Sequence, residues 1–395
     1  MSSAPAPQRR RITILGSTGS IGCNTLDVMA HLGGRTAFEV PAITGMCNIE
    51  LLAQQARTVG AGFAATADER RYNDLKSALS GSDIEIGAGP SALIEAAERD
   101  TDLLMAGIVG IAGLAPTLAA VAKGADIALA NKECLVSAGD LFGAAMATGG
   151  GKLLPVDSEH NAIFQVLDQH QRHAVERIIL TASGGPFRNY TREQMARVTP
   201  ESAANHPNWS MGLKISIDSA SMFNKALEMI EARHLFNMRP EQIEVIVHPQ
   251  SVVHSMVGYS DGSVLAQLGT PDMRTAIGYA ISHPRRASLP VERLDLAKLA
   301  RLDFIAPDET RFPALALARI AMQRGGLQGA ALNGAKEAAL DAFISGRIGF
   351  LEMADVVAMV MDRLDDGRGA GSIEDVYAAD SEAREIAATL MRKSA

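Results

Sequence analysis

The chain has 395 residues, of which 47% are hydrophobic and 21% charged, and its formal net charge is −8. This length predicts two or three domains with sizeable cores, and the acidic balance argues against a nucleic-acid partner or an anionic membrane surface. The three cysteines include no C-x-x-C pair, which fits a reducing compartment and argues against a disulfide framework or a zinc site. No apolar run approaches the ~20 residues of a membrane-spanning helix, and the N-terminal arginines are followed by a short strand instead of the apolar h-region of a signal peptide. We therefore expect a cytoplasmic protein.

The first 155 residues are predicted to alternate between strands and helices. Strands are expected at 11–15, 38–44, 62–65, 102–106, 126–129 and 152–156. Helices are expected from the first glycine-rich turn to about 32, and at 49–58, 69–79, 91–98, 114–122 and 135–147. This spacing is typical of right-handed βαβ units, which form a parallel sheet covered on both faces. Residues 1–155 are therefore predicted to form a doubly wound, Rossmann-like nucleotide-binding domain.

A turn with three glycines, GSTGSIG, joins the first strand to the first helix at Gly16–Gly22. Glycines in this position let the backbone approach a pyrophosphate, which then lies at the N-terminus of the helix. The alternative is a tight connection that binds no ligand. At the end of the second strand, around Cys47, the sequence has neither the carboxylate of an NAD site nor a base for a 2′-phosphate.

Two polar residues, Asn131 and Lys132, follow the predicted strand 126–129. Ligands bind at the carboxyl ends of parallel strands, so Asn131 is a candidate for the nicotinamide side and Lys132 for an anionic substrate. The alternative is an ordinary helix start with charged residues.

Three carboxylates predict a metal site. Asp157 and Glu159 are two residues apart, so on an extended backbone both would point to one side. Together with Glu228 they would make an oxygen-only triad, which suits Mg²⁺ or Mn²⁺. The alternative is a solvated acidic turn.

Beyond residue 155 the pattern changes to mixed strands and long loops, which predicts an α+β domain over 156–290. Its strands are expected at 175–182, 214–217, 244–247, 252–259 and 264–268, with a hairpin turn between the last two. A linker at 291–311 leads to residues 312–395. There, apolar residues at helical spacing predict a four-helix bundle with helices at 314–322, 332–344, 351–364 and 380–391.

The segment 206–231 is predicted to carry much of the chemistry. A helix opening near Ser219 would start with a Ser/Asp-rich cap, whose backbone N–H groups can bind an anion such as phosphate. Asn224, Lys225 and Glu228 would then project on one side of that helix. The alternative is a solvated helix face with one ion pair.

Other residues could complete a substrate site. Ser183 and the two glycines after it can form a backbone nest, which with Ser219 would hold a phosphate or hydroxyl groups. His206 could bind substrate or act as an acid or base, and the nearby Trp209 is a hydrophobic anchor or the tip of a lid. His248 and His254 are spaced unlike zinc ligands, so we expect both to be structural.

Taken together, the motifs resemble those of the 1-deoxy-D-xylulose 5-phosphate reductoisomerase family. The matching segments occur in the same order along nearly the whole chain: GSTGSIG, LANKE, PVDSEHNAIFQ, SGGPF, HPNWSMG, KISIDSASMFNKALEMIEA, HPQSVVHSMV and LAQLGTPDMR. The resemblance implies an enzyme that isomerises a small phosphorylated sugar, 1-deoxy-D-xylulose 5-phosphate, and reduces it to 2-C-methyl-D-erythritol 4-phosphate. It also implies NADPH, one Mg²⁺ or Mn²⁺ ion (sometimes Co²⁺), a homodimer, and a lid at 205–212.

The resemblance assigns roles to individual residues. The metal ligands are Asp157, Glu159 and Glu228, and Lys132 and His206 join them as catalytic residues. The substrate contacts are Lys132, Ser158, Glu159, Ser183, His206, Trp209, Met211, Ser219, Asn224, Lys225 and Glu228. The cofactor contacts are Thr18, Gly19, Ser20, Ile21, Cys47, Asn48, Asn131, Glu133 and Gly212.

A basic residue that the family often carries near Cys47 is absent, which predicts a weaker than usual preference for NADPH over NADH. Two other classes of protein stay open on the residues alone. One is a plain NADP-dependent dehydrogenase, and the other is a dinucleotide-binding redox sensor. Neither needs a site with three carboxylates and two lysines.

Overall fold

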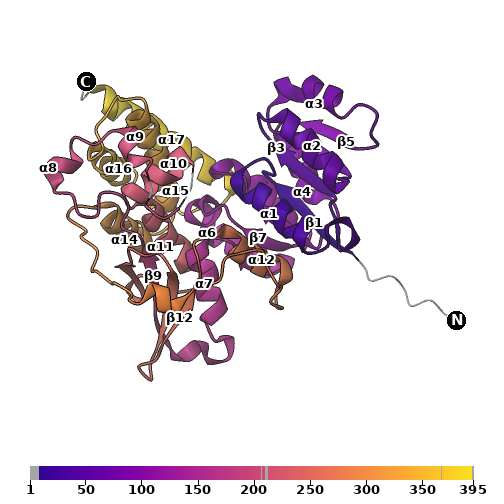
Figure 1. Ribbon diagram of the computed structural model, residues 1–395. Coiled ribbons are helices and arrows are strands. Elements are labelled where there is room, and N and C mark those ends of the chain that lie inside the picture. The colour runs from indigo at the N-terminus through magenta and orange to yellow at the C-terminus, as the bar shows by residue number, and fades with distance from the viewer. Residues whose placement is uncertain (1–8, 206, 210–211, 366, 394–395) are drawn as a thin grey trace. The chain divides into compact units, whose positions relative to one another are not determined.

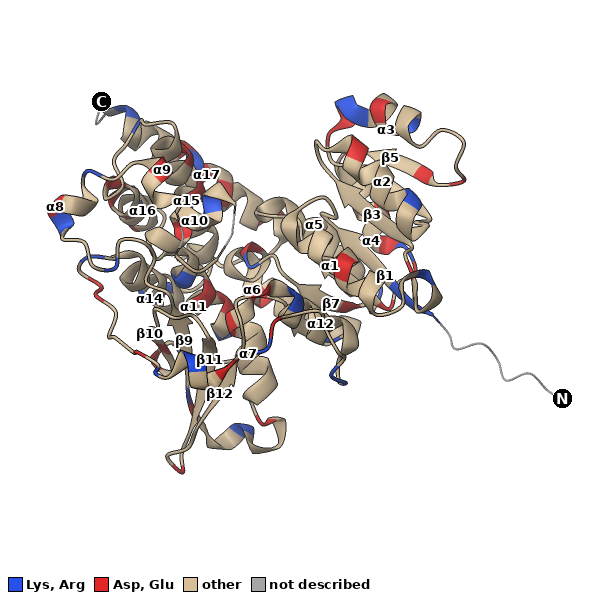
Figure 2. Cartoon of the chain, viewed as in Figure 1, with Lys and Arg blue, Asp and Glu red and all other residues tan. Residues whose placement is uncertain are grey.

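Residues distant in the sequence come together in two structural units. The computed structural model describes residues 9–205, 207–209, 212–365 and 367–393. The first unit comprises the chain up to 131 together with 144–157 and 272–292. The second comprises 132–143, 158–271 and the chain from 293 onward. Acidic and basic residues are interspersed over both units (Figure 2).

The first unit is built on a parallel sheet with the strand order β5-β4-β3-β1-β6-β7-β8, and β2 pairs with β1 (Figure 1). Its strands are β1 (Arg10–Leu15), β2 (Phe38–Glu39), β3 (Ala42–Gly45), β4 (Phe63–Thr66), β5 (Glu85–Ala88), β6 (Leu103–Ala106), β7 (Asp126–Leu129) and β8 (Leu153–Pro155). Every residue of β3, β4 and β6 is buried, as expected for a parallel sheet covered on both faces. The strand order reverses beside β1, which is the switch point where doubly wound sheets bind ligands. The predicted Rossmann-like fold is confirmed.

Helices surround this sheet. They are α1 (Ser20–His31), α2 (Ile49–Val59), α3 (Tyr72–Ala78), α4 (Pro90–Glu98), α5 (Leu114–Ala122), the last turns of α6 (Glu133–Gly149), and α12 (Met273–Ser282). Helix α12 comes from much later in the chain and packs against α1, where Arg274 lies 3.2 Å from Asp27. The Arg10 guanidinium also donates to the backbone carbonyl of Ile281 at the end of α12.

The second unit contains a mixed sheet with the order β10-β9-β11-β12. Strands β9 (Val175–Ala182) and β10 (Ile243–Val247) are parallel, whereas β11 (Val253–Tyr259) runs antiparallel to β9 and to β12 (Val264–Leu268). The hairpin predicted between the last two strands is present.

Most of the second unit is helical. Its helices are the first part of α6, α7 (Ser158–Val166), α8 (Arg192–Met195), α9 (Pro200–Ala203), α10 (Leu213–Ala220), α11 (Phe223–Phe236), α13 (Leu296–Leu299), α14 (Ala314–Arg324), α15 (Gln328–Ile344), α16 (Glu352–Arg363) and α17 (Ile373–Lys393). The last four confirm the predicted C-terminal helical region. One core joins α11 to α14, α15 and α16, and α11 is buried along most of its length. Within the described ranges, no helix combines the length and apolar character that crossing a membrane requires.

Two predictions for the segment after the lid are wrong. Residues 214–217, predicted as a strand, lie inside α10, and the helix predicted to open near Ser219 begins at Phe223 instead. Lys-Ile-Ser-Ile alternates like a strand, but Ile217 and Ala220 share a buried helix face while Ile215 is 39% exposed. Met222, with a φ of 64°, turns the chain between α10 and α11.

Candidate active site

Three carboxylates converge where α7 begins. Asp157 is the residue immediately before α7, Glu159 lies in its first turn, and Glu228 lies in the second turn of α11. One oxygen from each of the three carboxylates lies within 4.8 Å of the others. The extended backbone predicted for Asp157 and Glu159 is wrong, because Ser158 already starts a helix. The two side chains nevertheless approach each other at this helix start.

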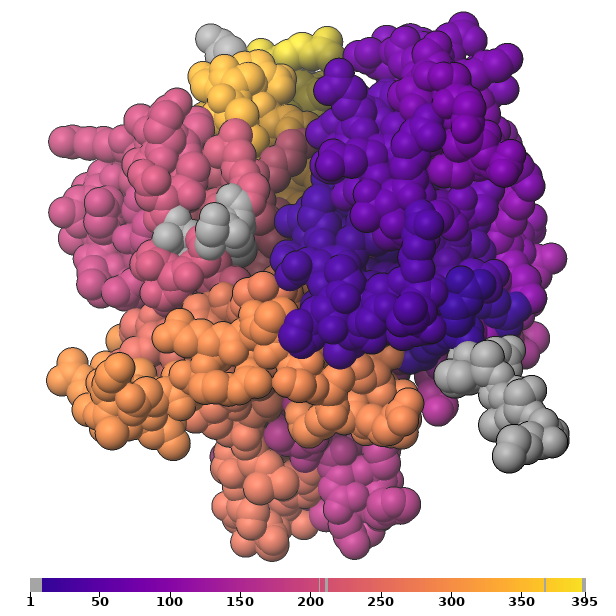
Figure 3. Space-filling view, turned by 45° about the vertical axis from the view of Figure 1, so that its right-hand side comes forward, coloured from indigo at the N-terminus to yellow at the C-terminus, as the bar shows by residue number. Residues whose placement is uncertain are grey.

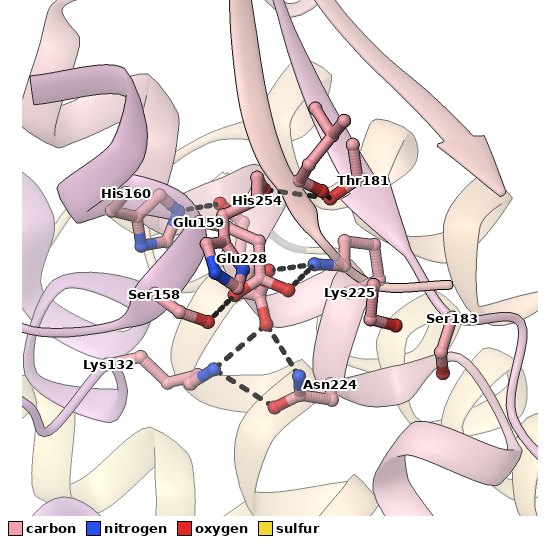
Figure 4. Close-up of polar contacts among 12 residues, drawn as sticks. Lys132, Ser158, Glu159, His160, Thr181, Ser183, Asn224, Lys225, Glu228 and His254 are labelled. Carbon is pink, nitrogen blue, oxygen red and sulfur yellow. Dashed lines mark hydrogen bonds and ion pairs between the residues drawn. The ribbon is translucent and has the colours of Figure 1, made fainter. Parts of the chain in front are cut away.

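Glu228 is the centre of this cluster, and its side chain is fully buried. The Lys132 ammonium lies 3.2 Å from Glu228 Oε1, and the Asn224 amide donates to the same oxygen at 2.5 Å. The Lys225 ammonium contacts Glu228 Oε2. Figure 4 shows these three side chains pointing toward Glu228. A buried carboxylate requires such partners, because an unpaired charge in the interior is very costly.

The donor set fits a hard divalent cation. The Lys225 ammonium also lies 2.7 Å from Glu159 Oε1, so one positive charge bridges two of the three carboxylates. Carboxylate oxygens alone, without thiolate or imidazole, are the ligands that Mg²⁺ and Mn²⁺ prefer. Ser158 donates a hydrogen bond to Glu159 Oε2 and so helps to orient that carboxylate.

A second polar pair lies behind the carboxylates and was not predicted. His160 Nε2 lies 2.9 Å from the backbone carbonyl oxygen of Glu228, and His160 Nδ1 lies 3.0 Å from Glu231 Oε2. A carbonyl oxygen can only accept, so Nε2 carries the hydrogen. His160 and Glu231 are both fully buried. They connect α7 to α11, and no sequence motif marks a contact of this kind.

The Ser183 loop packs against the end of α10. Gly184 and Gly185 have φ values of 79° and 64°, and a Cβ at Gly185 would lie 2.9 Å from Ala220 Cα. The Gly185 N–H donates to Ser183 Oγ at 3.1 Å. Residues 183–185 therefore form a turn beside Ser219, and the anion-binding nest stays a prediction.

Ser219 itself does not lie at a helix N-terminus, so the prediction that backbone N–H groups of a helix start bind an anion there is wrong, and only the Ser219 hydroxyl is left as a candidate contact. It lies near the carboxyl end of α10, where the helix dipole disfavours anions. The nearest helix start is that of α11 at Phe223, whose first turn carries Asn224 and Lys225. The donors available to a phosphate are thus these two side chains and the serine hydroxyls.

The glycine-rich turn of the first unit has the geometry of a phosphate cradle. Gly16 has a φ of 79°, and a Cβ there would lie 2.6 Å from the Gly107 carbonyl oxygen. Helix α1 starts at Ser20, and among the described residues no side chain caps it at Gly19. The loop is held by the Thr44 hydroxyl, which accepts from Gly16 N–H at 2.9 Å. The predicted contacts Thr18, Gly19, Ser20 and Ile21 all lie in this turn.

Asn131 and Asn48 are held by local hydrogen bonds. The Asn131 amide donates to the carbonyl oxygens of Ile108 and Gly110, and among the described residues its buried Oδ1 has no hydrogen-bond partner. That oxygen can accept a hydrogen bond from a carboxamide such as that of nicotinamide. Asn48 caps α2 by accepting from the Leu51 N–H.

Cys47 is exposed, and a basic residue, Arg70, lies near it in the turn that follows the next strand. Gly45 and Thr66 are register partners, and the Thr66 hydroxyl donates to the Met46 carbonyl oxygen at 2.7 Å. The turns after β3 and β4 therefore lie side by side. The second turn carries Arg70, which pairs with Asp68 at 2.9 Å. Sequence reasoning missed Arg70 because it considered only the turn after β3.

The lid is only partly described. His206 and Met211 lie outside the described residues. Trp209 lies with its ring centroid 6.1 Å from that of His254, and Asn208 donates to the Pro249 carbonyl oxygen at 2.6 Å. Gly212 is the N-cap of α10.

His254, expected to be structural, lies near the carboxylates. Burial lowers the pKa of His254, and the nearby negative charge of Glu159 opposes that shift. The sequence carried no signal for this position, because β11 brings His254 there from far along the chain. Glu133, predicted as a cofactor contact, is buried at the start of α6, and burial raises the pKa of its carboxyl.

A parallel sheet with a glycine-rich turn at its first helix, together with an oxygen-only carboxylate cluster flanked by two lysines, defines a metal-dependent oxidoreductase that uses a dinucleotide. The family models described as 1-deoxy-D-xylulose 5-phosphate reductoisomerase and its C-terminal domains match residues 12–139, 153–236 and 268–386. The chain belongs to the 1-deoxy-D-xylulose 5-phosphate reductoisomerase family.

Relatives and solved structures agree with this assignment. The chain is 73% identical to the 1-deoxy-D-xylulose 5-phosphate reductoisomerase of Sinorhizobium fredii over 97% of this chain and 98% of the relative. It is 64% identical to that of Agrobacterium fabrum, covering 97% and 96%. Among solved structures, the Zymomonas mobilis enzyme in complex with NADPH is 52% identical, with a TM-score of 0.92 over 97% of this chain and 99% of that one. A reductoisomerase in complex with NADPH, fosmidomycin and magnesium is 41% identical, also with a TM-score of 0.92, over 97% and 98%.

Proposed function

We propose that the cluster around Glu228 is the site of the family's reaction in this chain: the NADPH- and metal-dependent conversion of 1-deoxy-D-xylulose 5-phosphate to 2-C-methyl-D-erythritol 4-phosphate. The observation that carries the proposal is the convergence of Asp157, Glu159 and Glu228, with Lys132 and Lys225 on the buried Glu228. A simple hydride transfer between a nucleotide and a carbonyl has no need of this arrangement.

The three carboxylates would hold the divalent ion. When bound, Mg²⁺ or Mn²⁺ supplies a Lewis acid and a template for neighbouring carbonyl and hydroxyl oxygens. Lys132 is fixed by two acceptors, Glu228 Oε1 at 3.2 Å and Asn224 Oδ1 at 2.9 Å, so its ammonium is preorganised beside the carboxylates. The Lys132 ammonium group is therefore placed to stabilise negative charge on a substrate oxygen and to keep a proton close to that oxygen.

The phosphate group would be bound by Lys225, Asn224, Ser183 and Ser219. Lys225 supplies charge, and the amide and hydroxyl groups supply oriented hydrogen bonds. This binding is remote from the reacting carbons, so its energy can orient them. The lid residues, with Trp209 beside His254, would then exclude water from the site.

NADPH would bind the first unit and supply a hydride. Thr18, Gly19, Ser20 and Ile21 would hold its pyrophosphate, because the start of α1 offers backbone N–H groups in a turn without side-chain obstruction. Asn131 would accept from the nicotinamide carboxamide through its buried Oδ1. Arg70 is well placed to bind the 2′-phosphate beside Cys47 and Asn48.

A homodimer is proposed on the exposed sheet edge. β12 is the last strand of the second sheet, and its residues Val264, Leu265 and Leu268 are 46%, 47% and 36% exposed. Figure 3 shows the β11–β12 hairpin at the outer surface of this unit. An exposed apolar edge strand favours pairing with another chain. Leu265→Lys should therefore shift the mass measured by light scattering toward the monomer.

We also expect the reaction to take place in the cytoplasm.

The test of the function is oxidation of NADPH, followed at its absorbance band, with 1-deoxy-D-xylulose 5-phosphate and added Mg²⁺ or Mn²⁺. We expect turnover that stops when EDTA is added and returns when the metal is restored in excess. Unchanged turnover in EDTA would contradict the role of the carboxylates. Turnover of NADPH with simple aldehydes but not with this substrate would favour a plain dehydrogenase.

A further inference from the structure

A buried ion pair outside the carboxylate cluster joins α15 to α10. Lys336 Nζ lies 3.0 Å from Asp218 Oδ2, and the two residues are only 4% and 8% exposed. Removing an ammonium group from water is unfavourable unless its partners compensate. Breaking this pair should therefore have consequences that breaking a surface pair does not.

A second buried carboxyl group, that of Glu133, interacts electrostatically with the same ammonium group. Burial alone would lower the pKa of Lys336. The pKa is nevertheless raised overall by the negative charges of three neighbouring carboxylates, those of Asp218, Glu133 and Glu337. Lys336 is also the strongest opposing influence on the pKa of Glu133, which burial raises. Lys336 is therefore a cation that pairs with Asp218 of α10 and interacts electrostatically with Glu133 of α6. Helix α15 also packs closely on α6, because a Cβ at Gly329 would lie 1.9 Å from the Val136 carbonyl oxygen.

The positions of these carboxylates in the sequence connect them to the substrate site. Glu133 directly follows Lys132, and Asp218 directly precedes Ser219. Lys132 contacts Glu228, and Ser219 lies beside the Ser183 loop. The Lys336 ammonium group thus interacts with the neighbours in sequence of two proposed substrate contacts, Lys132 and Ser219. These two contacts are more than eighty residues apart in the chain.

The helix that carries Lys336 is itself fixed. Glu337, the next residue on α15, lies 2.6 Å from Arg384 of α17, and Arg384 also lies 2.6 Å from Asp380. Most of α15 is buried. Lys336 consequently has little freedom to follow movements of α6 or α10, and it acts on them as a fixed charge.

We infer that Lys336 is a positioning residue, which holds the start of α6 and the end of α10 against α15 and thereby fixes Lys132 and Ser219 for the substrate. The inference rests on the proposed function, since it assumes that these two residues bind the substrate. The C-terminal helices would then contribute to substrate binding although Lys336 itself does not touch the substrate.

The test compares two lysines that both join α10 to α15 in the full-length enzyme with NADPH and Mn²⁺. Lys336→Met removes the buried charge. Lys214→Met is the matched control, because Lys214 lies 2.7 Å from Asp341 but the two side chains are 60% and 51% exposed. We expect Lys336→Met to raise the KM for 1-deoxy-D-xylulose 5-phosphate by about tenfold or more, since small misplacements are costly. The KM for NADPH and the Mn²⁺ affinity, measured by electron paramagnetic resonance, should stay within about twofold, as should all constants of the control.

A double variant keeps the inference testable if Lys336→Met folds poorly. Lys336→Met combined with Asp218→Asn removes both charges of the ion pair and should recover part of the stability lost in urea unfolding, because Glu133 still lacks its cation. The inference requires that the KM for the sugar phosphate stays high in this variant. Recovery of that KM together with stability, or a Lys336→Met enzyme indistinguishable from the control, would overturn it. Absence of turnover by the unaltered enzyme would instead refute the proposed function.

Discussion

The Lys225 ammonium lies 2.7 Å from the Glu159 carboxylate and at the same time contacts Glu228. A cation therefore lies between two proposed metal ligands, on the residue that is also proposed to bind phosphate. This relationship means that metal binding and phosphate binding share one side chain, and their effects can be separated by substitution.

Lys225→Met should weaken substrate binding without weakening metal binding. Loss of a charged hydrogen bond to phosphate is worth about 1.5–3 kcal/mol, or roughly tenfold to a hundredfold in KM. Mn²⁺ should bind at least as tightly, because a competing cation is removed from Glu159 and Glu228. Steady-state kinetics and a Mn²⁺ titration measure the two effects. Lys298→Met, which removes an 87% exposed lysine, serves as the control and should change neither. A parallel loss of metal affinity would contradict this interpretation.

Glu228→Gln should abolish turnover and leave cofactor binding intact. Several kcal/mol of metal-dependent stabilisation corresponds to roughly a thousandfold or more in rate. NADPH binding, followed by fluorescence titration, should be unchanged, because the contacts proposed for its pyrophosphate, its nicotinamide and its 2′-phosphate lie in the first unit. Loss of the buried carboxylate should also lower the free energy of unfolding by about 3 kcal/mol, since a neutral amide no longer compensates the charges of the Lys132 and Lys225 ammonium groups.

A glutamate-to-glutamine substitution at the protein surface serves as the control for Glu228→Gln. Glu244 of β10 pairs with Arg177 at 3.4 Å, and its side chain is 51% exposed. Glu244→Gln should retain full activity and stability. If Glu228→Gln lost NADPH binding as well, the separation of the cofactor and metal sites would be wrong.

Arg70 should decide the choice between NADPH and NADH. The sequence around Cys47 alone predicts a weak preference, whereas Arg70 on the neighbouring turn would supply a charge for the 2′-phosphate. Arg70→Gln should lower kcat/KM for NADPH by about tenfold and leave the NADH value unchanged. Arg71→Gln, next to it but paired with Asp74 at 3.0 Å, is the control. Equal effects on both nucleotides would show that Arg70 is not a 2′-phosphate contact.

His234 should make the protein less stable in mild acid. Burial lowers the pKa of His234, and Asp140 at 3.6 Å only partly opposes this. A histidine with a lowered folded-state pKa takes up its proton first in the unfolded chain. Its stabilising contribution is present above the unfolded pKa near 6.5 and is lost as the pH falls from there through the folded pKa. His234→Gln should flatten the decline in unfolding free energy between about pH 7 and 5. The exposed His173→Gln should not.

Much of the fold follows from local pattern. The strands at 126–129, 175–182 and 264–268 and the helix at 114–122 have the predicted bounds, because each is an apolar run between turn residues. The segment 214–217 shows the limit of this reasoning. Its alternation indicates a strand, but burial of one face of α10 in the second unit selects a helix.

The candidate site was less predictable than the fold. Asp157, Glu159 and Glu228 stand out because paired carboxylates are chemically conspicuous, although their convergence arises from a helix start and not from an extended strand. The partners His160 and Glu231 left no trace in the sequence, since a buried hydrogen bond between two helices has no fixed spacing along the chain. The same holds for Lys336 and Asp218, which are 118 positions apart.

The return of residues 272–292 to the first unit has a practical consequence. The cofactor-binding portion of this chain cannot be excised with a single cut, because α12 follows all four strands of the mixed sheet in the chain and yet packs against α1. A fragment ending at 157 would expose to solvent the surface of α1 that α12 covers. Such a fragment should precipitate or bind nucleotide poorly. Co-expression of a separate 272–292 peptide, or its fusion through a flexible tether, is the route to an autonomous nucleotide-binding module.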